Sequence, residues 1–331
     1  MFIIESYSIA VIFCFITMLC WGSWANTQKL TAGNWRFELF YWDYVLGILI
    51  FTLFLALTLG SMGENGRSFM DDINQASNSN LRSAFVGGII FNAANILLSA
   101  AIAIAGMSVA FPVGIGLALV IGVIVNYLDA PVGDPLILFA GVACVAAAIG
   151  LNAYAFKRQA AGQKQTSSKG LLLSVISGCM MGLFYKYVAN SMTIDFANPE
   201  ALKLTPYTAL FLFSLGILAS NFVFNSLLMR FPITGSQVNI SEYFKGTSRN
   251  HLMGILGGGI WSLGMSFSIL ASEKAGPAIS YGLGQGATVV AAIWGIYIWK
   301  EFKNAPPIVH RILNLMLLFY MIGLATIIFS R

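Results

Sequence analysis

The chain of 331 residues is 58% hydrophobic and only 9% charged, and its formal net charge is +5. Because soluble domains carry about 25% charged residues, this composition excludes a water-soluble fold. It indicates an all-α integral membrane protein of the lipid bilayer, built from spanning segments of about 20 residues. The basic residues lie in short loops without interleaved aromatics, so we expect no nucleic-acid partner.

Ten apolar segments follow one another along the chain, and each is long enough to cross a bilayer. They are predicted at 6–28, 37–60, 81–104, 107–127, 135–156, 169–189, 205–228, 250–271, 276–299 and 308–330. The loops between the third and fourth segments and between the eighth and ninth are very short. Each of these pairs therefore forms a tight antiparallel hairpin.

The first segment carries the motif CWGSW at 20–24. Trp21 and Trp24 are candidates to line a cavity, because a flat aromatic ring stacks on a planar base or on the apolar face of a sugar. For Trp24 the alternative is a place in the aromatic belt at the membrane interface.

The second segment carries Asp43, the first candidate for binding a coupling proton. A carboxylate at this depth is costly and usually faces the interior of the bundle, where burial favours its neutral form. The alternative places Asp43 at the cytoplasmic interface, paired with Arg36 or Lys29. Glu38, nearer the loop, is the second candidate.

Pairs of asparagines mark the third and seventh segments. Asn92 and Asn95 are three residues apart and share one helix face. Because an amide both donates and accepts hydrogen bonds, it suits an amide-rich heterocycle or a sugar hydroxyl. Hydrogen bonding between helices is the alternative, and both readings apply equally to Asn221 and Asn225.

A glycine-rich motif occurs twice. AGMSVAFPVGIG spans 105–116 and AGPAISYGLGQG spans 275–286, at an offset of 170 residues. Small residues let membrane helices approach closely, so these residues are predicted to serve close packing or gating of a cavity. The predicted packing residues are Pro112, Gly114, Gly116, Gly276, Gly282, Gly284 and Gly286.

The duplication predicts two five-helix repeats, at 1–160 and 169–331, joined by a cytoplasmic linker at 161–168. Since each half has an odd number of spans, the second half must insert upside down relative to the first. Inverted repeats are typical of secondary transporters, whose substrate site lies between the halves near the middle of the membrane.

Residues near the second copy complete the predicted cavity. Trp261 and Ser262 precede the motif, and Tyr281 lies within it. Gln285 occupies the position of Ile115 in the first copy, so it adds a polar group on one side only. The predicted substrate-binding residues are Trp21, Trp24, Asn92, Asn95, Phe111, Asn221, Asn225, Trp261, Ser262, Tyr281 and Gln285.

Motifs for other chemistry are missing from the sequence. The four cysteines form no CxxC pair and the two histidines have no neighbouring ligand, so we expect no metal and no cofactor. The linker lacks a phosphate-binding motif, and there is no nucleophile–base constellation of an enzyme.

The basic residues predict the orientation. Twelve of the 18 lie on the side that holds the linker and six on the side of the N-terminus. The positive-inside rule makes the linker side cytoplasmic and places both termini outside the cytoplasm.

At the level of families, ten spans in two halves, CWGSW and the glycine-rich fourth and ninth segments resemble the drug/metabolite transporter superfamily. YWDY at 41–44, followed by VLGILI and by TLGSMG at 58–63, resembles the ureide permease family, and WGS is similar to the bacterial glucose/ribose porter family. The resemblance to the ureide permeases implies proton-coupled uptake of allantoin, uracil and related nucleobases. The resemblance to the glucose/ribose porters implies proton-linked uptake of monosaccharides. Plant ureide permeases carry a longer central cytosolic segment than this chain.

These features predict a secondary active transporter of the bacterial plasma membrane, a monomer or homodimer. We expect it to import a ureide or nucleobase, such as allantoin, uracil or xanthine, with protons by alternating access. The alternatives are proton-linked uptake of glucose or ribose, and export of drugs or metabolites.

Overall fold

The computed structural model describes residues 1–31, 35–160, 168–233 and 235–331. Ten of its helical segments are long and apolar enough to cross a membrane, and the predicted bounds differ from theirs by no more than four residues. Within the described residues there is no strand beyond one isolated bridge between Met192 and Leu204. The all-α membrane fold with ten spans is therefore confirmed.

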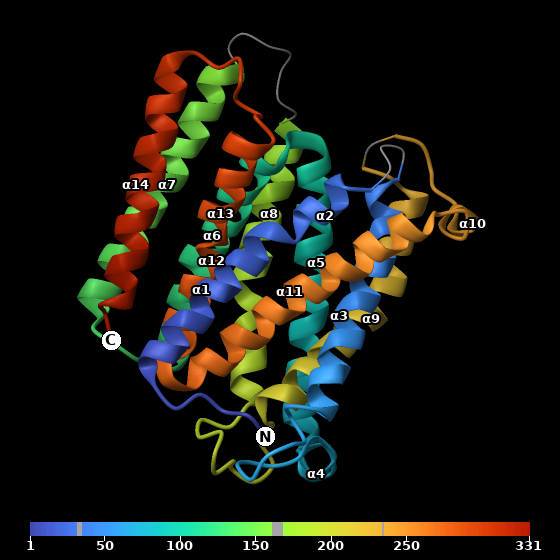
Figure 1. Cartoon of the computed structure of the whole chain (residues 1–331), viewed down its shortest axis with the longest axis vertical. Coiled ribbons are helices and arrows are strands. Elements are labelled where there is room, and N and C mark those ends of the chain that lie inside the picture. Colours follow the sequence, from blue (N-terminus) through green and yellow to red (C-terminus); the bar gives the residue numbers. More distant parts are fainter. Residues whose placement is uncertain (32–34, 161–167, 234) are drawn as a thin grey trace.

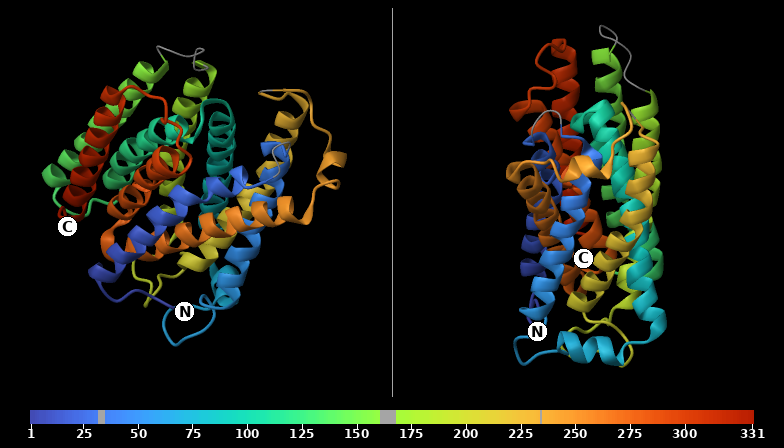
Figure 2. Two further views of the ribbon diagram at one scale, coloured as in Figure 1. Left: turned by 45° about the horizontal axis from the view of Figure 1, so that its top comes forward. Right: turned by 90° about the vertical axis from the view of Figure 1, so that its right-hand side faces the viewer.

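The ten spans follow the chain in order. They are α1 (Tyr7–Ser23) with α2 (Ala25–Lys29), α3 (Phe37–Leu57), α5 (Asn78–Ala105), α6 (Met107–Asp129), α7 (Pro135–Ala160), α8 (Ser168–Ser191), α9 (Pro206–Arg230), α11 (Ser248–Ala275), α12 (Pro277–Gln285) with α13 (Ala287–Ile293) and η1 (Trp294–Ile298), and α14 (Pro307–Ile328). Two short helices, α4 (Phe69–Gln75) and α10 (Ile240–Tyr243), lie in the connections. In the right-hand view of Figure 2 most of the long helices run along the long axis, with α4 across one end of the bundle, whereas α1 and α11 cross the bundle obliquely in Figure 1.

The two five-span groups interlock. In Figure 1, α7 and α14 lie together at one side of the bundle and α3 and α9 at the other. The third span of each group packs against the first two spans of the other group. Thus α5 packs on α8 and α9, and α11 packs on α1 and α3. The contact between the groups therefore runs through the middle of the molecule.

The repeated motif has the same local structure in both copies. Helices α5 and α11 each have 28 residues and each end at a glycine with positive φ, Gly106 at 82° and Gly276 at 83°. At their starts, Ser77 and Thr247 accept hydrogen bonds from the amides of Asn80 and Asn250. The very short loops predicted after the third and eighth segments are confirmed, because a single residue separates the helices in each case. The antiparallel hairpins stay a prediction.

Close helix contacts recur at the same offset. A Cβ on Gly88 of α5 would stand 2.0 Å from the carbonyl oxygen of Phe213 in α9. A Cβ on Gly258 of α11, 170 residues later, would stand 2.0 Å from the carbonyl oxygen of Tyr44 in α3. Both positions need glycine because the two backbones touch.

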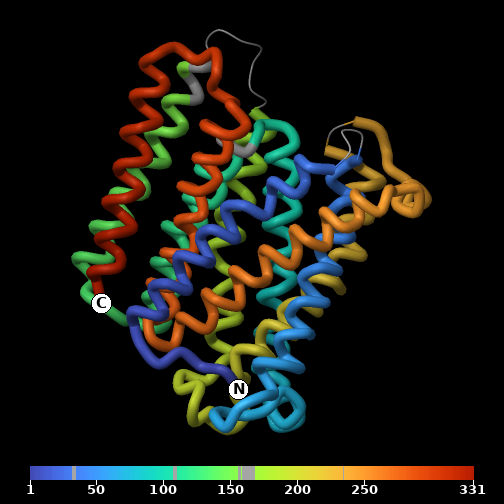
Figure 3. The backbone as a smooth tube through the Cα atoms, in the orientation of Figure 1, coloured from blue at the N-terminus to red at the C-terminus, as the bar shows by residue number. Residues whose placement is uncertain are grey.

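The first helices of the two groups, α1 and α8, run in opposite directions along the bundle in Figure 3. The N-terminus and the loop 192–205 lie at the same end of the molecule in this view. The inverted repeat and the bounds 1–160 and 169–331 stay predictions. The predicted linker 161–168 lies outside the described residues except for Ser168.

The ninth span, predicted as one helix, is interrupted at Gly286. The Gly286 amide donates to Leu283 and the Val289 amide donates to Gly286, so the hydrogen bonds tighten to the i−3 pattern between α12 and α13. The span then closes with the π-helical turn η1. Glycine is a poor helix former, and the glycines of the motif are concentrated at this break.

Large apolar side chains on the outside of the bundle fit a lipid environment. Ile50, Leu136 and Phe222 are more than half exposed although they lie in spanning helices. Aromatic residues instead fill the centre, where Trp24, Phe111 and Tyr281 are buried in one core cluster. This pattern is expected where the solvent is lipid hydrocarbon.

Candidate functional site

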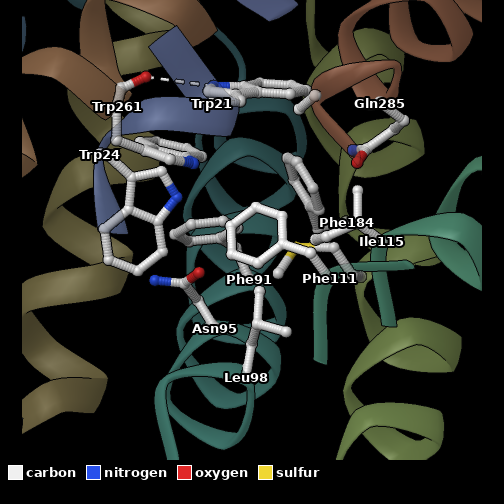
Figure 4. A pocket seen from close by; sticks show the side chains of 12 residues that line it. Trp21, Trp24, Phe91, Asn95, Leu98, Phe111, Ile115, Phe184, Trp261 and Gln285 are labelled. Carbon is white, nitrogen blue, oxygen red and sulfur yellow. Dashed lines mark hydrogen bonds between the residues drawn. The ribbon is translucent and has the colours of Figure 1, made fainter. Parts of the chain in front are cut away.

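A small pocket lies at the centre of the bundle between the two groups of spans (Figure 4). Its walls come from α1, α5, α6, α8, α11 and the break between α12 and α13. The lining residues are Trp21, Trp24, Phe91, Asn95, Leu98, Phe111, Ile115, Met181, Phe184, Trp261, Gln285 and Ala287. Six of the predicted substrate-binding residues are thus brought together here: Trp21, Trp24, Asn95, Phe111, Trp261 and Gln285.

The pocket is nearly closed. Its free volume is about 20 Å³, which is room for about one water molecule. A ring-shaped metabolite would therefore need the surrounding helices to move apart before it could enter. The structure represents a closed conformation of this region.

Aromatic rings form most of the wall. The rings of Trp21 and Trp261 stack with centroids 5.9 Å apart and planes 10° apart, and Phe91 approaches Trp261 at 4.2 Å. The Trp21 indole N–H donates to the Trp261 carbonyl at 3.1 Å, the dashed line in Figure 4. Trp24 packs on Tyr44 and is 2% exposed. The alternative placement of Trp24 in the interfacial belt is therefore wrong.

Two amide side chains supply the polar part of the wall. Asn95 and Gln285 lie on different sides of the aromatic cluster in Figure 4. The Asn95 amide donates to the hydroxyls of Tyr41 at 3.1 Å and Tyr44 at 3.3 Å. These bonds fix Asn95 against α3, so its orientation is set before any ligand binds.

Asn92 lies one helical turn away, outside the pocket wall. Its oxygen accepts from Tyr41 at 3.0 Å and its nitrogen donates to Ser220 at 2.9 Å. Asn92 therefore links α5 to α3 and α9, as in the alternative reading from the sequence.

The other four predicted residues also lie outside the pocket. Tyr281 donates to the Met181 carbonyl at 2.8 Å and Ser262 to the Gly259 carbonyl at 3.2 Å. Asn225 donates to the Glu38 carbonyl at 2.9 Å. Within the described part of the chain, neither amide atom of the buried Asn221 has a hydrogen-bond partner. Their roles in substrate binding stay predictions.

The predicted packing glycines lie where helices meet. A Cβ on Gly284 would stand 3.0 Å from the ring of Trp21, and one on Gly286 would stand 2.6 Å from the sulfur of Met18. Gly114 lies against the backbone of α8 and Gly282 against Val123. Glycine at Gly284 and Gly286 therefore lets the broken span approach α1 beside the pocket. A gating role for these positions and for Pro112, Gly116 and Gly276 stays a prediction.

Asp43 lies inside α3 with 2% of its side chain exposed. One carboxylate oxygen is 2.9 Å from Nδ1 of His251 in α11, and the other accepts a hydrogen bond from the hydroxyl of Tyr243 in α10. The alternative pairing of Asp43 with Arg36 or Lys29 is wrong. Lys29 is 2.6 Å from Glu301, and Arg36 is 2.5 Å from the buried Glu38.

Sequence reasoning missed His251 and Tyr243. They lie 208 and 200 residues from Asp43, and no local spacing connects the three. Burial, followed by the hydrogen bond to Asp43, raises the pKa of Tyr243 above its usual value. Tyr243 is therefore neutral at physiological pH and acts as a donor.

The similarity to known proteins extends over nearly the whole chain. The family model of the ureide permeases matches residues 40–169 and 157–330, so the chain belongs to the ureide permease family, a family of membrane transporters. The two matches overlap at 157–169, where the predicted linker lies. The chain is therefore a multi-pass membrane transporter for small molecules.

Curated relatives come from plants. Ureide permease 1 of Arabidopsis thaliana is 24% identical and the match covers 100% of this chain and 99% of the relative. Ureide permease 3 of the same plant is 25% identical over 84% of this chain and 89% of its own length. A solved crystal structure of another protein matches 96% of each chain at a TM-score of 0.55 with 15% identity, which shows a shared fold. The expected bacterial origin and membership of the drug/metabolite superfamily stay predictions.

Proposed function

We propose that this protein imports a ureide or nucleobase, such as allantoin, uracil or xanthine, by alternating access coupled to protons. The observation that carries the proposal is the closed aromatic pocket between the two groups of spans, with one amide on each side. The plant relatives are ureide permeases by name, which supports the same substrate class.

The chemistry of the pocket suits a flat heterocycle rich in N–H and C=O groups. Trp24, Phe111 and Trp261 offer ring faces for stacking. Gln285 supplies an amide donor and an acceptor, and Asn95, whose N–H groups are held by Tyr41 and Tyr44, supplies its carbonyl oxygen as an acceptor. These groups match the edge of a ureide or pyrimidine ring. A sugar would use the same amides but gain less from the ring faces.

Transport requires the closed pocket to open to each side in turn. The contact between the groups runs through α5, α9, α3 and α11, where glycines bring the backbones together. Contacts of this kind, made by backbones and small residues, permit one group of spans to rock against the other around a central site. This is the motion expected of inverted-repeat transporters. Asp43, buried at such an interface, supplies a group for coupling protons to the motion.

Reconstituted liposomes test the proposal. Uptake of labelled allantoin, uracil, xanthine, glucose and ribose is measured with and without an inwardly directed proton gradient. We expect accumulation of a ureide or nucleobase only with the gradient, and little uptake of the sugars. Accumulation of a sugar in place of these compounds would overturn the substrate class, and equal accumulation without a gradient would overturn proton coupling.

A further inference from the structure

The contact between Asp43 and His251 joins the two groups of spans. Asp43 belongs to α3 in the first group and His251 to α11 in the second. The backbones are close here, because a Cβ on Gly254 would stand 2.4 Å from the Cβ of Asp43. A relative movement of α3 and α11 must therefore change the 2.9 Å contact between the carboxylate and the imidazole.

Most of the other charges near the pair are held in ion pairs that include neither Asp43 nor His251. The titratable and charged residues on the elements around it are Lys29, Arg36, Glu38, Tyr41, Tyr44, Arg230, Glu242, Tyr243, Lys245 and Arg249, with Glu273 and Lys274 at the far end of α11 and Tyr207 at the far end of α9. Ion pairs join Lys29 to Glu301, Arg36 to Glu38 and Lys245 to Glu242. Among the ion pairs of the described residues, the basic partner of Asp43 is therefore the imidazole of His251.

An imidazole differs from Lys or Arg because its charge changes within about pH 5 to 8. With His251 protonated, the pair carries no net charge, and with His251 neutral it leaves a carboxylate charge in a spanning helix. The second state is costly at membrane depth. Proton binding to this pair therefore changes the free energy of the closed contact between the groups.

The surroundings give His251 a fixed position and a route to solvent. The rings of Trp35 and Tyr243 meet the imidazole edge-on at 5.5 and 4.7 Å. Its side chain is 26% exposed while that of Asp43 is 2% exposed. The imidazole is thus the member of the pair that can exchange a proton with water.

The pair is also connected to the central pocket. Along α11, His251 and Trp261 are ten residues apart, about 15 Å at 1.5 Å per residue. Along α3, Tyr44 follows Asp43 directly, accepts a hydrogen bond from Asn95 and packs on Trp24. Both helices that hold the pair therefore also shape the substrate site.

We propose that the Asp43–His251 pair is the proton-binding site that couples the gradient to transport, with the proton carried on the His251 imidazole. The inference rests on the proton-coupled uptake proposed above. His251 takes a proton from water on one side, keeps it while the groups reorient, and releases it to water on the other side. The pair then returns to its starting protonation state.

Uptake by variants in liposomes gives the first test. His251→Gln keeps a polar side chain but cannot carry the proton, and His310→Gln is the matched control, because His310 is the other histidine of the chain and is exposed on α14. For His251→Gln we expect the ratio of gradient-driven accumulation to counterflow exchange to fall at least about fivefold, the lower end of typical coupling between two binding sites. The pH dependence of uptake should flatten, while His310→Gln behaves as wild type.

Accumulation by His251→Gln at the wild-type ratio and with the wild-type pH profile would overturn this inference but leave the proposed function intact. If wild-type protein exchanges substrate but does not accumulate it with a gradient, proton coupling itself fails. If it moves none of the substrates, the proposed function fails.

A second measurement does not depend on how the His251 variant folds. Because the chain has two histidines, ring NMR of selectively labelled His310→Gln protein reports His251 alone. We expect the ring signal of His251 to change with pH, and this change to differ when substrate is added. A His251 ring signal that does not respond to pH, or a response unaffected by a transported substrate, would overturn the inference.

Discussion

At the scale of single residues, the polar groups of the pocket differ between the two copies of the motif. Ile115 and Gln285 occupy equivalent positions, and both line the central pocket. The amide of Gln285 is therefore available to one side of a bound substrate only. A substrate held at this site would be recognised in one orientation.

We predict that Gln285→Ile, which makes the second copy like the first, raises the KM for the transported ureide or nucleobase about tenfold. Loss of a hydrogen bond to a buried polar group costs about 1–3 kcal/mol, and about 1.4 kcal/mol corresponds to a factor of ten. The measurement is initial uptake in liposomes at matched protein content. Thr326→Val on α14, outside the pocket lining, is the control. An unchanged KM for the variant would exclude Gln285 from substrate binding.

We predict a separate effect for Tyr243→Phe, which removes the hydrogen bond to Asp43 and little else. The pH profile of uptake should shift, because the carboxylate keeps His251 as its remaining partner, while the KM stays near the wild-type value. The measurement is uptake from pH 5 to 9 in steps of about half a pH unit, which is finer than the usual spread of pKa values in proteins. A changed KM with an unshifted profile would contradict the role given to Tyr243.

Single residues also show what the sequence could predict. The aromatic residues and Asn95 could be placed near a cavity because their side chains are unusual in a membrane segment and lie beside the repeated motif. The contact of Asp43 with His251 could not be predicted, since it depends on how α3 and α11 pack across the molecule. Tyr281 and Ser262 belong to the same motif region, yet their hydroxyls turn to backbone carbonyls.

At the scale of elements, helix contacts are set by the placement of glycine along each face. Gly258 and Gly259 are neighbours in α11 with opposite surroundings. A Cβ on Gly258 would meet the Tyr44 carbonyl, whereas a Cβ on Gly259 would meet nothing within 4 Å. The two positions therefore separate packing from helix propensity.

We predict that Gly258→Ala destabilises the protein by about 1–3 kcal/mol, the usual cost of overpacking. Gly259→Ala should be neutral or stabilising by up to about 1 kcal/mol, since alanine favours the helix. Thermal unfolding of both variants in detergent gives the comparison. Equal melting temperatures would mean that α3 and α11 are not in close contact.

The ends of the helices could be predicted from the sequence, because changes in hydropathy and the positions of glycine mark them. The break of the ninth span was not predicted. A run of glycines weakens a helix without deciding whether it will bend, end or continue, and the packing of Gly284 and Gly286 against α1 decides it here.

At the scale of the whole molecule, the two ends of the bundle differ in their loops. Loop 192–205 lies at the end with the N-terminus, whereas α10 and its flanking loop lie toward the opposite end (Figure 1). The excess of basic residues predicts that the first of these ends lies outside the cytoplasm.

We predict that a single cysteine at Asn198 is labelled by an impermeant maleimide in intact cells, whereas one at Ser241 is labelled only after the membrane is opened. Both positions are exposed. The background variant replaces Cys14, Cys20, Cys144 and Cys179 by serine or alanine. The reverse pattern would show that the orientation is wrong.

The interruption at Gly286 has a consequence for how specificity is encoded. Because the Gly286 amide donates to Leu283, the carbonyl of Gly282 lacks the donor that a continuous α-helix would give it. Gln285 and Ala287, on either side of the break, both line the pocket. The path of the broken helix, and not side chains alone, therefore shapes this part of the pocket wall. A side-chain substitution that leaves this path intact leaves that part of the shape unchanged.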